Sequence, residues 1–134
     1  MRYQTLEKRE LNIDQLEEGL LIKEDSFNPT HVFECGQCFN FHIEEDGSYT
    51  AVFLDKIINV SKKDDGVLIK NIDINEFYDL FYDYFDFGTD YQAIKADLSK
   101  NEILKEAADY GYGIRILNQP MFETIISFII SANN

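Results

Sequence analysis

The spacing of apolar residues changes once along the chain, near Asn71, and this change limits the folds that the chain can adopt. Before Asn71, apolar residues come in short runs separated by turn residues, as in strands joined by hairpins. After it, they recur at steps of three and four, which is the period of an amphipathic helix. The sequence predicts an α+β fold, with an antiparallel sheet over residues 1–72 and helices over residues 73–134.

The sheet half contains an alternating segment and two turns. Residues 39–43 alternate apolar and polar side chains, which predicts a strand with one buried and one wet face. Asp46-Gly47 offers the positive-φ turn of a hairpin, and residues 49–60 supply the returning strands. A second turn is expected at Asp64-Asp65-Gly66.

The second half predicts three helices. The first begins at Asp73, whose carboxylate can accept from the first turn, and ends near Gly88. The second follows the capping-box form Ser99-Lys100-Asn101-Glu102 and ends at Gly111. The third has Pro120 in its first turn and almost no polar face. Its large apolar residues are Met121, Phe122, Ile125, Ile126, Phe128, Ile129 and Ile130.

Such an apolar helix requires burial on all sides. Two interpretations stay open: the helix fills the core of this domain, or its partner lies beyond the end of a chain that has been cut at Asn134. In the second case we expect self-association through residues 125–130.

Length and composition indicate one globular domain over residues 1–134. Apolar residues make up 45% of the chain and aromatic residues 14%, which excludes a disordered or low-complexity polypeptide. The formal charge of −13 by itself argues against a nucleic-acid partner. From Ile116 onward, however, Glu123 is the one charged residue, so the acidic groups lie away from the end of the last helix and DNA stays open as a partner.

The compartment follows from what the sequence lacks. The apolar run that comes nearest to the length of a membrane span is residues 125–132, and it is far shorter than the roughly 20 residues that a bilayer helix needs. The first residues show no signal-peptide pattern, and two cysteines are too few for a disulfide scaffold. We expect a cytoplasmic protein with no membrane partner.

Candidate chemical groups are few. Cys35-Gly36-Gln37-Cys38 has the spacing of a redox or zinc pair, but no second pair exists and strand residues follow, which favours structural cysteines. No metal and no cofactor are therefore expected. Gly36 within a strand pattern marks either a bulge or a close backbone approach by a ligand. Asn133 and Asn134 either end the last helix or offer paired amides to a base edge.

These patterns define no catalytic site. The carboxylates Asp79, Asp83 and Asp86 are placed singly on exposed helix positions, as on a solvated face. The sequence contains no Ser/His/Asp set, no P-loop and no dinucleotide fingerprint.

Two segments together resemble the 8-oxoguanine DNA glycosylase family. Residues 33–41 (FECGQCFNF) resemble its Gly-Gln-x-Phe strand motif, and residues 114–119 followed by 127–134 resemble the helix before its helix-hairpin-helix region. The resemblance covers nearly the whole chain. It implies a TATA-binding-protein-like antiparallel sheet followed by helices, and nucleoid association in a bacterial cell.

The resemblance also implies an activity. The family flips oxidised guanine out of duplex DNA in base excision repair, attacks the sugar with a lysine amine and cleaves the strand through a Schiff base, as a glycosylase and AP lyase. Its catalytic lysine and aspartate lie beyond Asn134, so the 134 residues are expected to be a truncated and inactive N-terminal domain. We also expect them to bind damaged duplex DNA weakly, because they hold few basic residues for phosphate contacts.

The resemblance assigns contacts to four residues. At the position of Gly36, the family uses the backbone carbonyl to recognise the lesion base. Phe128 and Asn134 match positions that line the base pocket. Asn133 matches the asparagine that contacts the orphaned cytosine. Three other positions depart from the family: Asn40 and Phe41 stand where its eukaryotic branch commonly has an arginine and a tryptophan, and Cys38 replaces a serine.

Two alternatives remain. The charge is also compatible with a stand-alone acidic interaction module, such as a DNA mimic that binds a basic protein. A related alkylated-base glycosylase domain shares the architecture but not the Gly-Gln-x-Phe strand.

Overall fold

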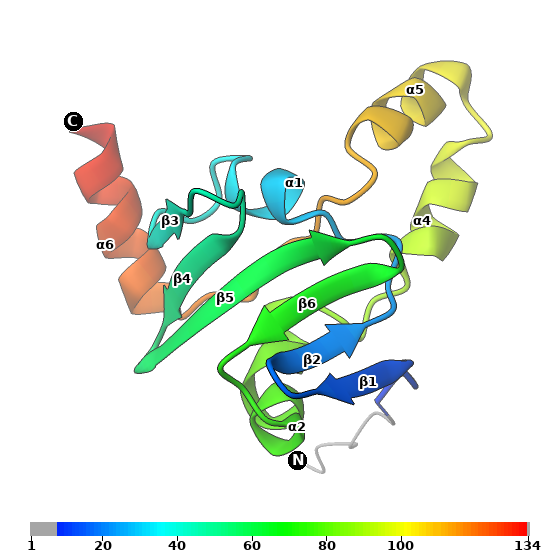
Figure 1. Ribbon diagram of the computed structural model, residues 1–134. Helices are drawn as coiled ribbons and strands as arrows, with labels where there is room; N and C mark the ends of the chain where they lie inside the picture. Colours follow the sequence, from blue (N-terminus) through cyan, green and yellow to red (C-terminus); the bar gives the residue numbers. More distant parts are fainter. Residues whose placement is uncertain (1–7, 134) are drawn as a thin grey trace, which may run out of the picture.

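A computed structural model describes residues 8–133 and shows an α+β arrangement (Figure 1). One antiparallel sheet has the strand order β1-β2-β6-β5-β4-β3. The strands are β1 (Ile13–Leu16), β2 (Gly19–Ile22), β3 (Phe41–Ile43), β4 (Tyr49–Phe53), β5 (Lys56–Lys63) and β6 (Gly66–Lys70). The helices are α1 (Pro29–Phe33), α2 (Ile74–Glu76), α3 (Tyr82–Tyr84), α4 (Tyr91–Leu98), α5 (Glu102–Tyr110) and α6 (Met121–Ala132), with a π-helical turn η1 (Phe77–Phe81) between α2 and α3. The predicted fold class is confirmed.

The hairpins form at the predicted turns. Gly47 has φ +80° between β3 and β4, as a positive-φ hairpin turn requires. Gly66 is the first residue of β6 rather than part of the preceding turn. A Cβ at Gly66 would lie 2.1 Å from the Ile22 carbonyl oxygen, so this glycine lets β2 and β6 approach each other.

The alternating segment 39–43 is only partly a strand. β3 begins at Phe41, and Phe39 lies outside the sheet. Ile43 is paired with the buried Tyr49 and lies on the same face of the sheet as Phe41, but at the end of this edge strand it is 46% exposed. The predicted strand is therefore shorter than expected, and Phe41 is its one apolar side chain that packs against the core.

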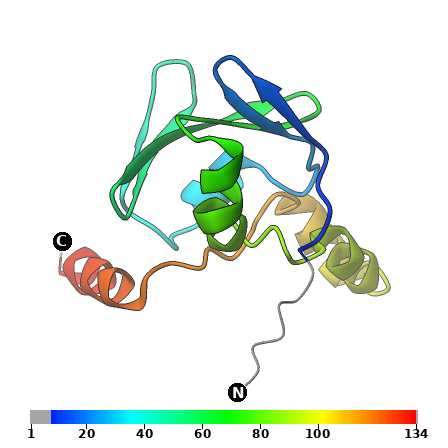
Figure 2. The ribbon, with the colours of Figure 1, turned by 90° about the horizontal axis from the view of Figure 1, so that it is seen from below.

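One helical segment, α2-η1-α3, crosses a face of the sheet (Figure 2). Its start is a capping box, in which the Asp73 carboxylate accepts from the Asn75 and Glu76 amides and Glu76 bonds back to the Asp73 amide. The α-helical run ends at Tyr84, four residues before the predicted Gly88. The core between this segment, α1 and the sheet is rich in fully buried phenylalanines: Phe27, Phe33, Phe77, Phe81, Phe85 and Phe87.

The remaining helices lie at the periphery. The pair α4 and α5 and the terminal helix α6 occupy opposite ends of the molecule (Figure 1). Helix α4 was not predicted, and the cap of α5 is Asn101 rather than Ser99. Pro120 is at the N-cap position of α6, just before the first turn, and makes no side-chain hydrogen bond there. Within residues 8–133, no helix is long and apolar enough to cross a bilayer.

Helix α6 is exposed. It contributes no buried residue, and Met121 and Phe122 are 78% and 79% exposed. The interpretation in which this helix fills the core of the domain is therefore wrong. The core is already filled by the aromatic residues between the sheet and the α2-η1-α3 segment.

Candidate functional site

The segment that carries the candidate residues is the loop of residues 34–40, between α1 and β3. Asn28 caps the start of α1 by accepting from the Thr30 amide at 3.0 Å. At the other end of the helix, the Tyr49 hydroxyl of β4 donates to the Glu34 carboxylate. Burial and this hydrogen bond both raise the pKa of Tyr49, so it stays a neutral donor. The loop therefore starts from a fixed point on the sheet.

Gly36 is an exposed residue in this loop. It follows the end of α1 in a bend and is not in a strand, so the predicted strand bulge is wrong. Its φ is +86°, a left-handed conformation that favours glycine, and an added Cβ would meet nothing within 4 Å. Among residues 8–133, no group donates a hydrogen bond to its carbonyl. The loop thus holds an exposed glycine whose carbonyl accepts no hydrogen bond from residues 8–133.

Gln37 fastens the loop and was not singled out from the sequence. Its side-chain Nε2 donates to the carbonyl oxygens of Val32 at 2.9 Å and Arg115 at 2.7 Å. Its Oε1 accepts from the Leu117 amide at 2.9 Å, and its own carbonyl accepts from the Gln119 side chain. Only the tertiary structure identifies this role, because residues 115–119 are about 80 positions away in the chain.

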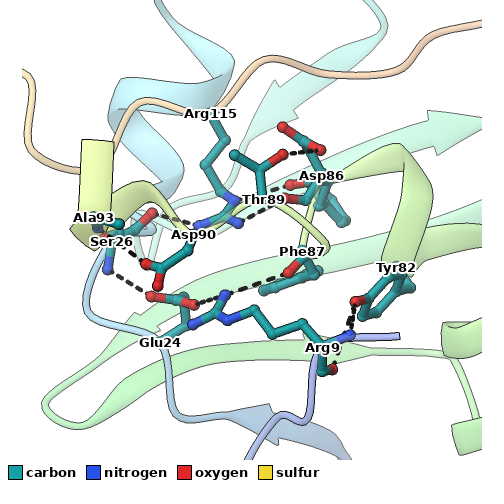
Figure 3. Close-up of polar contacts among 11 residues, drawn as sticks. Arg9, Glu24, Ser26, Tyr82, Asp86, Phe87, Thr89, Asp90, Ala93 and Arg115 are labelled. Carbon is teal, nitrogen blue, oxygen red and sulfur yellow. Dashed lines mark hydrogen bonds and ion pairs between the residues drawn. The ribbon is translucent and has the colours of Figure 1, made fainter. Parts of the chain in front are cut away.

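Three of those partners, Arg115, Leu117 and Gln119, belong to the segment of residues 113–119, which Arg115 holds against the body (Figure 3). Arg115 is fully buried and donates at 2.8 Å to each of the carbonyl oxygens of Phe85, Ser26 and Asp86. Its guanidinium also lies 4.3 Å from the centre of the Tyr91 ring. Burial lowers the pKa of Arg115 from its usual value.

A buried carboxylate accompanies this arginine. Glu24 is 4% exposed, accepts from the Ser26 amide at 3.1 Å and pairs with Arg9 Nη1 at 2.8 Å (Figure 3). Its charge opposes the lowering of the Arg115 pKa, which keeps the guanidinium protonated. The sequence gives little signal for this network, because a single arginine between Ile114 and Ile116 resembles an exposed strand position.

The two cysteines differ in exposure. Cys35 is exposed, whereas Cys38 is buried, and burial raises the pKa of the Cys38 thiol to about 12. Neither lies at a helix N-terminus, which would favour the thiolate. Within the described part of the chain, no group of three His, Cys, Asp or Glu side chains could hold a metal ion.

The end of the loop contacts α6. The ring of Phe39 meets that of Phe128 edge to face, with centroids 5.1 Å apart. Asn40 Nδ2 donates to Glu123 Oε1 at 2.7 Å, which engages the one carboxylate of this helix. An open hollow of about 430 Å³ lies beside these contacts and is lined by Phe39, Asn40, Ser127, Ile130 and Ser131.

The other predicted residues are placed as follows. Asn133 ends α6 and its side chain donates to the Ile129 carbonyl at 2.8 Å. Asn134 lies outside the described residues. Phe41 packs against Phe33 and Tyr49 on the core side. The structure therefore brings Phe128 to the loop of Gly36 through Phe39, while Asn133 bonds to its own helix.

The described residues thus form an α+β domain with an antiparallel sheet, a loop that carries an exposed glycine and a last helix that is apolar and exposed. The family model for the "8-oxoguanine DNA glycosylase, N-terminal domain" matches residues 19–125. The chain belongs to this family. No curated protein matches the chain.

Solved structures agree with this assignment. The chain is 45% identical to MBOgg1, solved in complex with a low-affinity DNA ligand, with a TM-score of 0.83 over 94% of the chain and 44% of that structure. It is 41% identical to the apo form of Clostridium acetobutylicum 8-oxoguanine glycosylase/lyase, with a TM-score of 0.83 over 91% of the chain and 43% of that structure. A complex of the Clostridium enzyme with double-stranded DNA containing cytosine opposite 8-oxoG gives 40% identity and the same TM-score, over 92% and 43%. The chain thus spans less than half the length of these structures.

Proposed function

We propose that this chain acts as the N-terminal part of a cytoplasmic 8-oxoguanine DNA glycosylase and AP lyase that excises oxidised guanine from duplex DNA. The observation that carries the proposal is the carbonyl of the exposed residue Gly36, which accepts no hydrogen bond from residues 8–133 and lies in a loop held by Gln37. The resemblance assigns lesion recognition to the carbonyl at this position. Similarity to a glycosylase/lyase solved with DNA containing 8-oxoG supports the same substrate.

The chemistry of recognition depends on one proton. Normal guanine presents N7 as an acceptor, whereas the oxidised base carries a hydrogen there. The Gly36 carbonyl would accept from that N–H and would face a lone pair on the normal base, which costs an unmade hydrogen bond. Glycine suits this position because its backbone has φ +86° and nothing projects toward the base.

Phe128, Asn133 and Asn134 would complete the contacts. The Phe128 ring is already held by Phe39 and is 45% exposed, so one face is available to line a base pocket. Asn133 and Asn134, at the end of α6, would enter the space left by the flipped base and contact the orphaned cytosine and the pocket, respectively.

Substituting Gly36 tests the proposal, with Gly47 as a matched control. Both glycines have positive φ, +86° and +80°, and at both a Cβ would meet nothing within 4 Å. In the complete enzyme, Gly36→Ala should slow excision of 8-oxoguanine opposite cytosine by about 100-fold, because the strained φ would shift the carbonyl and the methyl group would occupy space proposed for the base. Gly47→Ala should carry the same backbone strain, about 1–2 kcal/mol, without this loss. Single-turnover excision assays measure both.

Cleavage at a preformed abasic site provides the internal control, because it needs no base recognition. We expect Gly36→Ala to retain that cleavage. Equal excision by the two alanine variants, or wild-type enzyme that does not distinguish 8-oxoguanine from guanine, would contradict the proposal.

We further propose that the 134 residues alone are inactive, because the family's nucleophilic lysine and its aspartate have no counterpart among them. Borohydride reduction traps a Schiff base between a lyase and abasic DNA. The 134-residue chain should give no trapped complex, and it should bind duplex DNA weakly because its net charge is −13. A covalent complex, or tight and salt-sensitive binding in a gel shift, would show otherwise.

A further inference from the structure

Gly36 needs a support that the loop itself does not provide. Gly36 is exposed, and so are Glu34 and Cys35 before it, so the packing of these residues does not fix the direction of its carbonyl. The residues that follow, Gln37 and Cys38, are half-buried and buried. The Gly36 carbonyl shares one rigid peptide plane with the amide of Gln37. Whatever holds Gln37 therefore orients the acceptor.

We propose that Gln37 is the positioning residue for the lesion-reading carbonyl of Gly36, an inference that rests on the function proposed above. Its side-chain amide uses both donors, on the carbonyl oxygens of Val32 and Arg115, and its oxygen accepts from the Leu117 amide. One side chain thus joins the last turn of α1 to the segment of residues 113–119. A fourth bond, from the Gln119 side chain to the Gln37 carbonyl, fixes the backbone directly after Gly36.

The anchor of Gln37 is itself rigid. Arg115, whose carbonyl accepts from Gln37, is fully buried and donates three hydrogen bonds of 2.8 Å to the body of the domain (Figure 3). A chain of charge-assisted and amide hydrogen bonds therefore leads from the aromatic core through Arg115 and Gln37 to Gly36.

Glutamine is well suited to this position among the common side chains. It offers two donors and an acceptor on a stem of two methylene groups. Glutamate lacks the donors and would place a carboxylate against the carbonyl oxygens of Val32 and Arg115. Methionine has nearly the same length and forms none of the three bonds.

Gln37→Met in the complete enzyme tests the proposal. Excision of 8-oxoguanine opposite cytosine should fall about 10- to 100-fold, as for a misplaced recognition group, while cleavage of an abasic-site duplex should stay within about twofold of wild type. Asn118→Ala is the matched control, because it removes one hydrogen bond, from Asn118 Nδ2 to the Asp83 carbonyl, in the same segment without touching the loop. It should leave both activities unchanged.

Full excision by Gln37→Met, or a parallel loss of both activities, would overturn the proposal. Wild-type enzyme that does not excise 8-oxoguanine would instead overturn the proposed function.

A measurement on the unmodified 134-residue chain covers the case in which the variant fails to fold. By NMR, the Gln37 side-chain NH₂ should exchange with solvent at least about tenfold more slowly than those of the exposed Gln15 and Gln92. Equal exchange rates would show that the clamp does not form in solution and would contradict the proposal.

Discussion

Arg115 shows how one residue can decide the arrangement of a surface loop. A buried guanidinium is tolerated only when its donors are satisfied, and here they bond to three backbone carbonyls while Glu24 lies nearby as a buried counter-charge. Those bonds connect Arg115 to chain segments that are 29 to 89 residues away in the sequence. The loop that carries Gly36 is supported from this point.

Replacing this arginine should be costly. We expect Arg115→Met to lower the free energy of unfolding by about 3–5 kcal/mol, because it leaves three backbone carbonyl oxygens without their donor and removes the positive charge near the buried Glu24 carboxylate. Lys100→Met, whose side chain is 78% exposed in a surface ion pair, should change it by less than about 0.5 kcal/mol. Urea denaturation followed by circular dichroism measures both. Similar midpoints for the two variants would show that the Arg115 network contributes little.

At the scale of elements, the helices differ in how they are held. The α2-η1-α3 segment buries four aromatic residues, whereas α4 and α5 bury none. Capping therefore contributes a larger part of the stability of α5 than of the α2-η1-α3 segment. In the first turn of α5, the Asn101 side chain accepts from the Ile103 and Leu104 amides. Local opening of α4 and α5 should require less free energy than opening of the sheet.

Removing the N-cap side chain of α5 should affect local opening only, whereas removing that of α2 should affect global unfolding. Asn101→Ala removes about 1 kcal/mol of local stability and should speed amide exchange in residues 103–110 about fivefold, with the strands unaffected. Asp73→Ala, at the start of α2, should instead lower the global free energy of unfolding by about 1 kcal/mol. Hydrogen exchange with mass spectrometry distinguishes the outcomes. Faster exchange in the strands of Asn101→Ala would show that α5 is coupled to the core.

At the scale of the whole molecule, charge and exposed apolar surface are separated. The chain carries −13, yet α6 holds only Glu123, and that carboxylate accepts from Asn40. The outer surface of α6 exposes Met121, Phe122, Ile125, Ile129 and Ile130. An apolar patch of this kind marks an interaction surface.

We propose that the 134-residue chain by itself self-associates through α6. Phe122→Glu combined with Ile129→Glu should give a monomer by light scattering, because the two charges would oppose burial of the helix. Ile103→Glu, on the exposed side of α5 and 79% accessible, is the matched control and should leave the association unchanged. A wild-type chain that stays monomeric at high concentration would contradict the proposal.

Local signals in the sequence were sufficient for much of the fold. The positive-φ Gly47 and the capping box from Asp73 to Glu76 depend on a few neighbouring residues, so they could be predicted without knowing the tertiary structure. The same holds for the change in apolar period near Asn71. The resemblance motif located Gly36, but placed it in a strand instead of a loop.

The sequence by itself therefore determined the α+β class, the hairpins, the cap of the first predicted helix and the family. Only the tertiary structure decided that Gln37 clamps the Gly36 loop, that Arg115 is buried and that α6 stays exposed. The reason is physical: turns and caps are governed by contacts within a few residues, whereas these features arise from hydrogen bonds and packing between segments up to 89 residues apart. Such contacts leave no local pattern in the chain.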